Sequence, residues 1–373
     1  VRSAACRPPN PSTSTTFLST MADPAQHNAA YALLHTKTVA QLGTVADVAT
    51  LSKGDTVEDA VKLLNERKIH SAPVVDGKKA VGIVDMLDVA AHVCQVVPPS
   101  ADGGDGGGAA DGDDDATLPK PSAEDLKAMG GRTIALAPIG GVVNASDCDP
   151  LVELDEHTPS TVAAALFADG VHRCVITSGG ELKGVVSQSD MVAALAAAAS
   201  DSALAPMLDT PLHELGVGEA GITTCNVNDS VLRCLRVLRH YHHSAVPLVD
   251  DANVLKGTLS ISDVSALFAT RLPDFTMPVG EFLAKHSPKS MTPVCVKQAS
   301  ATMRDVLSTL GAEVTRVWCV DDDFKVTGVV SHTDVAKLVR DYVGDGGANP
   351  SKAAAAAAAA GGGGPPPPPP RRD

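Results

Sequence analysis

The stretch Gly328-Val-Val-Ser331-His-Thr-Asp334 decides the fold, because three near-copies of it occur earlier in the sequence. The copies are Gly257-Thr-Leu-Ser260-Ile-Ser-Asp263, Gly184-Val-Val-Ser187-Gln-Ser-Asp190 and Gly82-Ile-Val-Asp85-Met-Leu-Asp88. In each, a glycine opens a short apolar run, a polar residue follows, and an aspartate lies three positions further on. This pattern predicts a strand that ends at a helix N-cap. Four copies predict four repeats of one structural unit.

An amphipathic helix is expected upstream of each copy. In the first repeat, Thr56 and Asp59 are candidates for its N-terminal cap. Apolar residues follow with the spacing of one buried helix face. The predicted faces are Val57, Ala60, Val61 and Leu64; Val162, Ala165 and Leu166; Val231, Cys234, Leu235 and Leu238; and Met303, Val306, Leu307 and Leu310.

Each predicted helix leads to a predicted strand, and a tight turn then leads into the motif. These strands are Ser71 to Asp76, Arg173 to Thr177, Ser244 to Asp250 and Arg316 to Asp321. The turns are marked by pairs such as Asp76-Gly77 and Gly179-Gly180. The unit is therefore strand, helix, strand, strand, helix, an α/β (α+β) arrangement. A single unit would leave an apolar face uncovered, so the four are expected to form two pairs.

Composition shifts divide the chain around these repeats. The expected segments are an N-terminal extension (1–43), repeat 1 (44–97), an acidic Gly-rich linker (98–130), repeat 2 (131–199), an inter-module linker (200–217), repeat 3 (218–272), repeat 4 (273–344) and an Ala/Gly/Pro tail (345–373). The extension is expected to be partly disordered and the tail disordered. Residues 1–22 have the composition of an organelle transit peptide, but a translated leader is the preferred interpretation because Met21 is a plausible start.

Bulk composition limits the classes of function. The chain has 373 residues, 44% of them hydrophobic, with no uninterrupted apolar run long enough to cross a bilayer. Its formal net charge of −14 and aromatic content of 3% disfavour nucleic acid as a partner. Eight cysteines without a C-x-x-C pair fit reduced thiols. We therefore expect a cytoplasmic protein, with the nucleus as a second compartment and no membrane partner.

The repeats resemble those of four-repeat CBS-domain proteins, and among them the gamma regulatory subunits of AMP-activated and sucrose-non-fermenting-related protein kinases. The resemblance covers about Thr44 to Val343. It is carried by Leu212-His-Glu-Leu-Gly-Val-Gly218, His70-Ser-Ala-Pro-Val-Val-Asp76 and Val314-Thr-Arg316-Val-Trp-Cys-Val-Asp321. It implies two paired (Bateman) modules in a disc, clefts for AMP, ADP or ATP, and energy sensing for a kinase catalytic subunit and a beta-type subunit.

The resemblance also implies roles for particular residues. The motif aspartate accepts hydrogen bonds from the ribose, the motif serine helps to fix sugar or phosphate, and basic strand residues hold phosphates. The implied binding residues are Ser187, Asp190, Ser260, Asp263, Ser331, Asp334, Arg173, Arg316, His172, His70 and Asp88. Asp85 replaces the serine in the first repeat, which weakens that cleft. The second and fourth repeats combine the full motif with Arg173 and Arg316, whereas the third has no obvious strand arginine.

Other interpretations of the same residues stay open at this stage. A Ser-x-x-Asp stretch also forms a plain helix cap, and Arg173 and Arg316 could bridge to the acidic linker or to a neighbouring repeat. The run His240-Tyr-His242-His243 fits a solvated helix end better than a metal site. We expect no enzyme, since no nucleophile, base and orienting group occur together. The rival functions are a constitutive scaffold with degenerate clefts and an adenosyl-ligand sensor that regulates a non-kinase partner.

Overall fold

The computed structural model describes residues 29–96, 135–218, 221–265, 272–311 and 314–341. Residues 1–22, the linker 98–130 and the tail 345–373 lie outside these ranges, so the predictions made for them remain untested. Within the N-terminal extension, residues 29–42 form two short helices, α1 (Ala29–His35) and α2 (Val39–Leu42).

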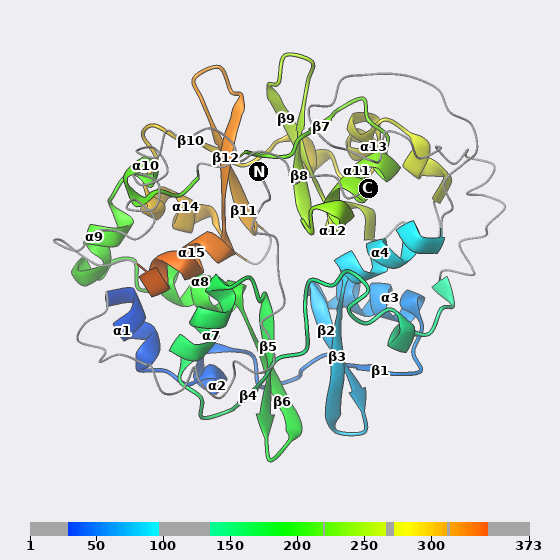
Figure 1. Cartoon of the computed structure of the whole chain (residues 1–373), viewed down its shortest axis with the longest axis vertical. Coiled ribbons are helices and arrows are strands. Elements are labelled where there is room, and N and C mark those ends of the chain that lie inside the picture. Colours follow the sequence, from blue (N-terminus) through cyan, green and yellow to red (C-terminus); the bar gives the residue numbers. More distant parts are fainter. Residues whose placement is uncertain (1–28, 97–134, 219–220, 266–271, 312–313, 342–373) are drawn as a thin grey trace, which may run out of the picture.

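The four repeats have the same order of elements, which confirms the predicted unit (Figure 1). Repeat 1 contains β1 (Leu51–Ser52), α3 (Val57–Arg67), β2 (Ser71–Asp76), β3 (Lys79–Asp85) and α4 (Met86–Val96). Repeat 2 contains β4 (Glu153–Asp155), α7 (Ser160–Ala168), β5 (Arg173–Ser178), β6 (Glu181–Ser187) and α8 (Gln188–Ala197). Repeat 3 contains β7 (Cys225–Asn226), α11 (Val231–His240), β8 (Ala245–Val249), β9 (Leu255–Ser260) and α12 (Ile261–Ser265). Repeat 4 contains β10 (Cys295–Lys297), α14 (Met303–Thr309), β11 (Arg316–Val320), β12 (Val326–Ser331) and α15 (His332–Asp341).

Short helices lead into or connect the repeats. They are η5 (Ile139–Gly141), η6 (Ser202–Leu204), α9 (Ala205–Leu208), α10 (Leu212–Leu215), η7 (Leu272–Thr276), α13 (Val279–His286) and η8 (Pro288–Met291).

Each repeat forms a three-stranded sheet in which the first strand runs parallel to the second and the third runs antiparallel to it. The predicted glycine turns are present: Gly77, Gly179 and Gly180 have φ of 65°, 60° and 80°, a left-handed conformation that glycine adopts without steric cost. The register places the first residue of the second strand opposite the motif serine, as in the pairs Arg173 with Ser187 and Arg316 with Ser331. A basic side chain on that strand therefore starts beside the motif.

The helix faces were predicted correctly in three repeats and wrongly in one. Thr56 and Asp59 form the expected capping box, and the predicted apolar residues of α3, α11 and α14 are buried. In α7 the face is instead made by Ala163, Ala164 and Phe167, whereas the predicted Val162, Ala165 and Leu166 are only partly buried. The helix begins at Ser160, earlier than the apolar pattern indicated, and the bulky Phe167 turns toward the core.

Repeats 1 and 2 form one pair and repeats 3 and 4 the other, through contacts between their sheets. In the first pair, the Leu182 backbone N donates to the Lys78 carbonyl at 2.9 Å, and Lys78 Nζ lies 3.1 Å from Glu181. In the second pair, the Leu255 backbone N donates to the Phe324 carbonyl at 3.0 Å. These contacts agree with the predicted pairing.

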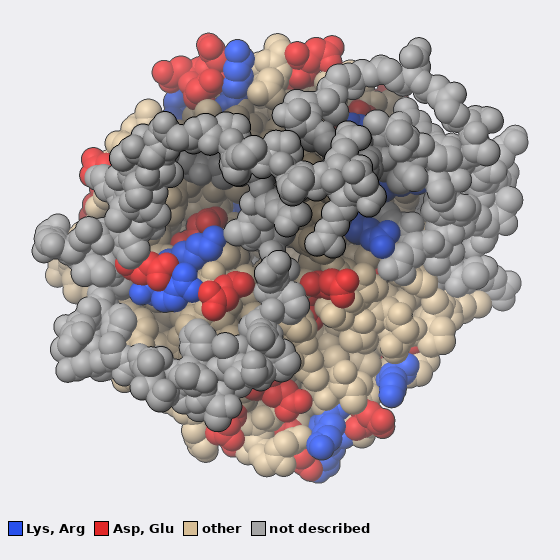
Figure 2. Space-filling view, viewed as in Figure 1, with Lys and Arg blue, Asp and Glu red and all other residues tan. Residues whose placement is uncertain are grey.

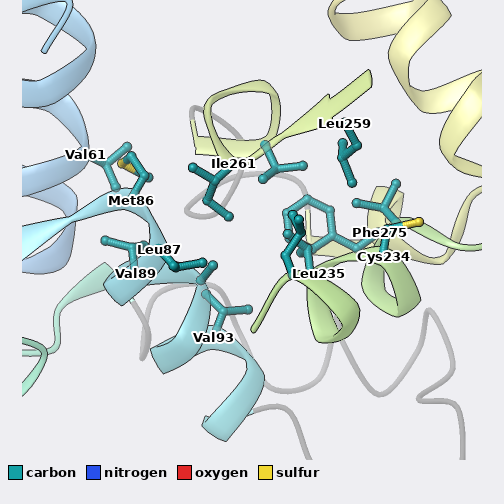
Figure 3. Close-up of a cluster of buried hydrophobic side chains, with 14 of the residues drawn as sticks. Val61, Met86, Leu87, Val89, Val93, Cys234, Leu235, Leu259, Ile261 and Phe275 are labelled. Carbon is teal, nitrogen blue, oxygen red and sulfur yellow. The ribbon is translucent and has the colours of Figure 1, made fainter. Parts of the chain in front are cut away.

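The helical cores join the pairs crosswise. One cluster combines Leu87 and Val93 of repeat 1 with Leu235 and Ile261 of repeat 3 (Figure 3). A second cluster combines helices of repeat 2 with helices of repeat 4 and also covers α1. Figure 1 accordingly shows two sheets above and two below, with the cores between them on either side. This closed arrangement of four repeats confirms the predicted disc.

The glycine that opens the motif is needed in repeats 1, 2 and 3, because another segment crosses the strand there. A Cβ atom on Gly184 would lie 2.5 Å from the Thr44 carbonyl oxygen, and one on Gly82 would lie 2.3 Å from a methyl group of Val143. In repeat 3, a Cβ on Gly257 would meet the Ser290 carbonyl oxygen at 3.0 Å. The crossing segments are those that lead into the partner repeat of the same pair, so these three motifs are held against their partners.

Among the described helices none alone is long and apolar enough to cross a membrane; the bent pair Gln188–Ala197 and Ser202–Leu208, with an angle of 118°, meets the length and composition criteria only in combination. On the face shown in Figure 2, acidic and basic side chains of the coloured residues are intermixed in small groups.

Candidate functional site

Three of the four motifs share one local geometry. Asp190 Oδ2 accepts hydrogen bonds from the Ser187 backbone N and Oγ, both at 2.7 Å. The corresponding Ser331 distances to Asp334 Oδ2 are 2.9 and 2.7 Å, and both Ser260 distances to Asp263 are 2.7 Å. The capping interpretation is therefore correct for one oxygen of each carboxylate. The other oxygen, Oδ1, decides what else the motif can do.

Oδ1 is available in the second and fourth repeats. Among the described residues, Asp190 Oδ1 accepts no hydrogen bond, and Asp334 Oδ1 has only the half-exposed Lys337 Nζ at 3.7 Å. Both aspartates are partly buried. Burial raises the pKa of Asp190, and the hydrogen bonds from Ser187 partly offset that rise. An oxygen of this kind can accept a hydroxyl from a ligand.

Oδ1 is already occupied in the first and third repeats. Asp88 Oδ1 accepts hydrogen bonds from Ser146 N at 3.0 Å and Ser146 Oγ at 2.7 Å, while Oδ2 accepts from Asp85 N at 3.1 Å. Asp263 Oδ1 accepts from Ser290 Oγ at 2.6 Å. Asp88 is also fully buried. We therefore leave Asp88 out of the ligand-binding set proposed below.

Three buried carboxylates lie near one another at the first motif: Asp85, Asp88 and Asp149. Burial raises the pKa of Asp85 well above its usual range, and the charges of Asp88 and Asp149 raise it further. The Asp85 side chain fills the place of the serine found in the other repeats.

Arg173 and His172 bind a neighbour that the sequence interpretation did not identify. His172 Nδ1 lies 2.9 Å from Asp149 Oδ1, and Arg173 Nη2 lies 3.8 Å from Asp149 Oδ2. Burial alone would raise the pKa of Asp149, but the charges of Arg173 and His172 outweigh it and hold that pKa well below its usual range. Arg173 Nη1 is buried without a hydrogen-bond partner. Arg173 thus bridges to a carboxylate of its own repeat, and Nη1 has no partner among the described residues.

Arg316 reaches across to the third repeat. Its Nη1 donates to the Ala245 carbonyl at 3.2 Å and its Nη2 to Ser244 Oγ, while Nε is buried without a partner. Ala245 pairs directly with the motif residue Ser260. Burial lowers the pKa of Arg316 to about 10, and Asp334 opposes this shift. The strand of the third repeat, β8, has no arginine of its own, as the sequence indicated. Arg316 of the fourth repeat lies beside the third motif instead.

His332, a residue not singled out from the sequence, lies within the electrostatic range of Arg316, His70 and His172. It is buried, its Nδ1 is 3.4 Å from Ser189 Oγ, and its Nε2 has no hydrogen-bond partner among the described residues. Burial, then the charges of Arg316, His70 and His172, lower its pKa to about 4. The only sequence signal was a histidine inside the fourth motif. The structure thus brings His70, His172, Arg316 and His332 into one electrostatic environment.

Within the run His240-Tyr-His242-His243, His242 makes structural contacts. His242 Nδ1 lies 3.0 Å from the Ser146 carbonyl oxygen and 3.3 Å from Cys148 Sγ, which links repeat 3 to the segment that leads into repeat 2. Within the part of the chain described, no group of three or more His, Cys, Asp or Glu side chains could hold a metal ion.

The CBS domain family model matches residues 39–94, 145–197, 217–269 and 291–341, which together make up more than half of the chain. The chain therefore belongs to the CBS-domain family, with four CBS domains.

Two curated relatives and one solved structure illustrate what the chain is similar to. Protein SDS23 of Yarrowia lipolytica is 23% identical over 82% of this chain and 66% of its own length. Protein SDS23 of Podospora anserina is 23% identical over 76% of this chain and 55% of its own length. The chain thus spans less than two thirds of either relative. A Methanocaldococcus jannaschii structure, proposed as an archaeal homologue of g-AMPK, aligns over 81% of this chain and 99% of its own, with a TM-score of 0.59 and 15% identity. That likeness supports the fold.

Proposed function

We propose that this protein is a non-catalytic regulatory subunit that binds adenine nucleotides in the clefts of its second and fourth CBS repeats. The observation that carries the proposal is that Oδ1 of Asp190 and of Asp334 accepts no hydrogen bond from the described residues, in motifs whose other oxygen is fixed by Ser187 and Ser331. A carboxylate held in this way suits the vicinal diol of a ribose, since it can only accept hydrogen bonds.

Buried side-chain nitrogens without a partner supply the second half of the argument. Buried polar groups normally have a partner, and Arg173 Nη1, Arg316 Nε and His332 Nε2 have none among the described residues. All three belong to the second and fourth repeats, whose motifs contain Asp190 and Asp334. An anionic phosphate group would satisfy the two arginine donors with charge-assisted hydrogen bonds, and the neutral His332 ring could donate from Nε2. In their protonated forms, His172 and His70 would add to the positive potential at the same place.

The kinase partner rests on the resemblance to gamma regulatory subunits and on the archaeal fold neighbour. In this proposal, AMP, ADP and ATP differ in affinity for two states of the protein, and occupancy biases a kinase catalytic subunit through a beta-type subunit. A ligand shifts such an equilibrium only by its difference in affinity for the two states. We propose a cytoplasmic and nuclear location for this complex.

Calorimetric titration with AMP and with ATP tests the binding step. The wild-type protein should bind two nucleotides, and Asp190→Asn and Asp334→Asn should each remove one with little change in the unfolding temperature. Asp323→Asn is the matched control, because Asp323 is an exposed aspartate of the β11–β12 hairpin away from the motif.

Absence of heat and of a thermal shift at millimolar nucleotide would reject nucleotide binding and favour the scaffold function. The partner is tested separately by co-purification from native extract with mass spectrometry. Recovery of the protein without any kinase or beta-type subunit would reject the kinase assignment and favour an adenosyl-ligand sensor with another partner.

A further inference from the structure

We propose that the third repeat contains a complete nucleotide cleft that Ser290 holds closed, so that removal of one hydroxyl group opens a third binding site. This inference rests on the proposed ribose-binding role of the motif aspartates. It concerns Asp263, whose second carboxylate oxygen is bonded within the chain rather than free.

The contact between Ser290 and Asp263 imitates the contact that a ribose hydroxyl would make. Ser290 Oγ donates to Asp263 Oδ1 at 2.6 Å, the short distance typical of a hydroxyl bonded to a carboxylate. Oδ2 is meanwhile held by Ser260, as in the second and fourth motifs. The oxygen that Ser290 occupies therefore corresponds to the one that is free in Asp190. A nucleotide can reach it only by displacing the serine.

The third repeat also has the other side chains that we propose for nucleotide binding in the second and fourth repeats. Asp263 is only partly buried, and the hydrogen bonds from Ser260 match those in the other complete motifs. The Arg316 guanidinium lies against Ser244 and Ala245, beside Ser260, with its Nε buried and without a partner. A cation and an acceptor are thus both present.

Ser290 cannot readily withdraw from the cleft. It lies in η8, where its backbone N donates to the Ser287 carbonyl at 2.9 Å. Its own carbonyl oxygen lies so close to β9 that a Cβ atom on Gly257 would be 3.0 Å away. The backbone is therefore fixed against the strand, and the hydroxyl group stays in the cleft. Deleting the hydroxyl should open the site without moving this segment.

The first repeat provides an internal comparison. Ser146 makes the same type of contact with Asp88 at 2.7 Å. There, however, Asp88 is fully buried, Asp85 replaces the motif serine, and Asp149 is bound by Arg173 and His172. Removal of the Ser146 hydroxyl would leave all of these obstacles in place. The inference therefore applies to the third repeat and not to the first.

The test is to count the nucleotides bound to the full chain and to its Ser290→Ala variant, by native mass spectrometry and calorimetric titration with AMP and with ATP. We expect two in the wild type and three in Ser290→Ala, with the third site bound roughly tenfold to a hundredfold more tightly than in the wild type, the range expected for one hydrogen bond to a charged group. Ser290→Ala/Asp263→Asn should return the count to two. Ser287→Ala, in the same turn, and Ser146→Ala should leave the count at two.

The outcomes separate this inference from the proposed function. Two nucleotides in both the wild type and Ser290→Ala would overturn the closed third cleft and leave the proposed function intact. Three nucleotides bound to the wild type, with one lost in Asp263→Asn, would also overturn the closure of the third site by Ser290. No nucleotide bound to the wild type but one bound to Ser290→Ala would support the third site and reject the proposed sites in the second and fourth repeats. No nucleotide bound to either protein would reject both the inference and the proposed function.

Discussion

Gln188 Nε2 in α8 donates a hydrogen bond of 3.0 Å to Thr333 Oγ1 in α15 and so joins the second motif directly to the fourth. Each residue lies between the serine and the aspartate of its own motif. Ser189 and His332 approach each other in the reciprocal manner at 3.4 Å. The corresponding contact between repeats 1 and 3 includes the apolar side chains Met86, Leu87 and Ile261 (Figure 3). Hydrophobic packing thus joins both halves of the disc, and the hydrogen bond from Gln188 to Thr333 adds a polar contact between repeats 2 and 4.

Replacement of Gln188 by Met, the residue at the same place in the first motif, should destabilise the protein by about 1 to 3 kcal/mol. Gln188 is buried, and its amide also donates to the Phe167 and Val171 carbonyls, both at 3.1 Å. The substitution removes the donor that the Val171 carbonyl and the Thr333 hydroxyl share, while the Phe167 carbonyl keeps the hydrogen bond from Gly170 N. Chemical denaturation measures the loss, with the exposed Lys183→Met as control. Equal stability of Gln188→Met and the wild type would show that these hydrogen bonds make no net contribution to the free energy of unfolding.

Gly184→Ala should destabilise the protein more than Gly257→Ala. The added Cβ would lie 2.5 Å from the Thr44 carbonyl oxygen in the first case and 3.0 Å from the Ser290 carbonyl oxygen in the second. Overpacking of this kind costs about 1 to 3 kcal/mol, and here the clash is with backbone. Thermal unfolding gives the order. Gly54→Ala is the control, because its Cβ would meet nothing within 4 Å. A lower unfolding temperature for Gly257→Ala than for Gly184→Ala would contradict the closer approach of the Thr44 segment to β6.

His332 should make stability fall as pH falls from 6.5 to about 4. Its pKa is lowered to about 4 in the folded state, by burial and then by Arg316, His70 and His172, so in this window the unfolded chain binds a proton that the folded protein does not. The contribution is fully present above pH 6.5. In His332→Leu, the loss of unfolding free energy between pH 6.5 and pH 4 should be smaller than in the wild type by an amount on the order of 3 kcal/mol.

The free energy of unfolding, measured by denaturant titration at pH 7, 5.5 and 4.5, checks this expectation. The exposed His157→Leu should keep the wild-type slope, since water surrounds that side chain before and after unfolding. An unchanged slope in His332→Leu would assign the acid sensitivity to other groups.

Arg173→Met should destabilise the protein by about 3 to 5 kcal/mol, because it leaves the buried Asp149 carboxylate with His172 alone. Adding Asp149→Asn to this variant should recover part of the loss, since the unpaired charge is then removed. A double-mutant cycle of denaturation free energies measures the coupling between the two residues. Additive effects would mean that the 3.8 Å contact carries no net interaction.

The fold could be predicted largely from the sequence, because four copies of one motif fix the element order and because most of the apolar faces follow the helical period. The α7 face was an exception: an alanine-rich helix has little pattern, so its one large residue, Phe167, determines the orientation. The crosswise helical cores were not predicted, since the apolar stripes of α4 and α8 are equally able to pack on either remaining repeat.

The candidate site could be predicted only in part. The motif serines and aspartates were identified, because they repeat. Ser146 and Ser290, which close two of the motifs, come from segments that do not repeat in sequence, and Asp149 and His332 gain their significance only from the residues folded around them. Arg316 was assigned to the correct strand, but the direction of its side chain toward Ala245 could not be read from spacing.

The crosswise cores also constrain how the chain can reach its folded state during synthesis. When repeats 1 and 2 have been made, their sheets can pair, but Leu87 and Val93 of repeat 1 still lack the residues of repeat 3 that cover them, and Met191 and Leu195 of repeat 2 still lack α15. The surface on repeat 1 stays uncovered until repeat 3 has been made, and the surface on repeat 2 until the last repeat has been made. The four repeats should therefore behave as one cooperative folding unit, and a nascent chain released after the second repeat should be prone to aggregation.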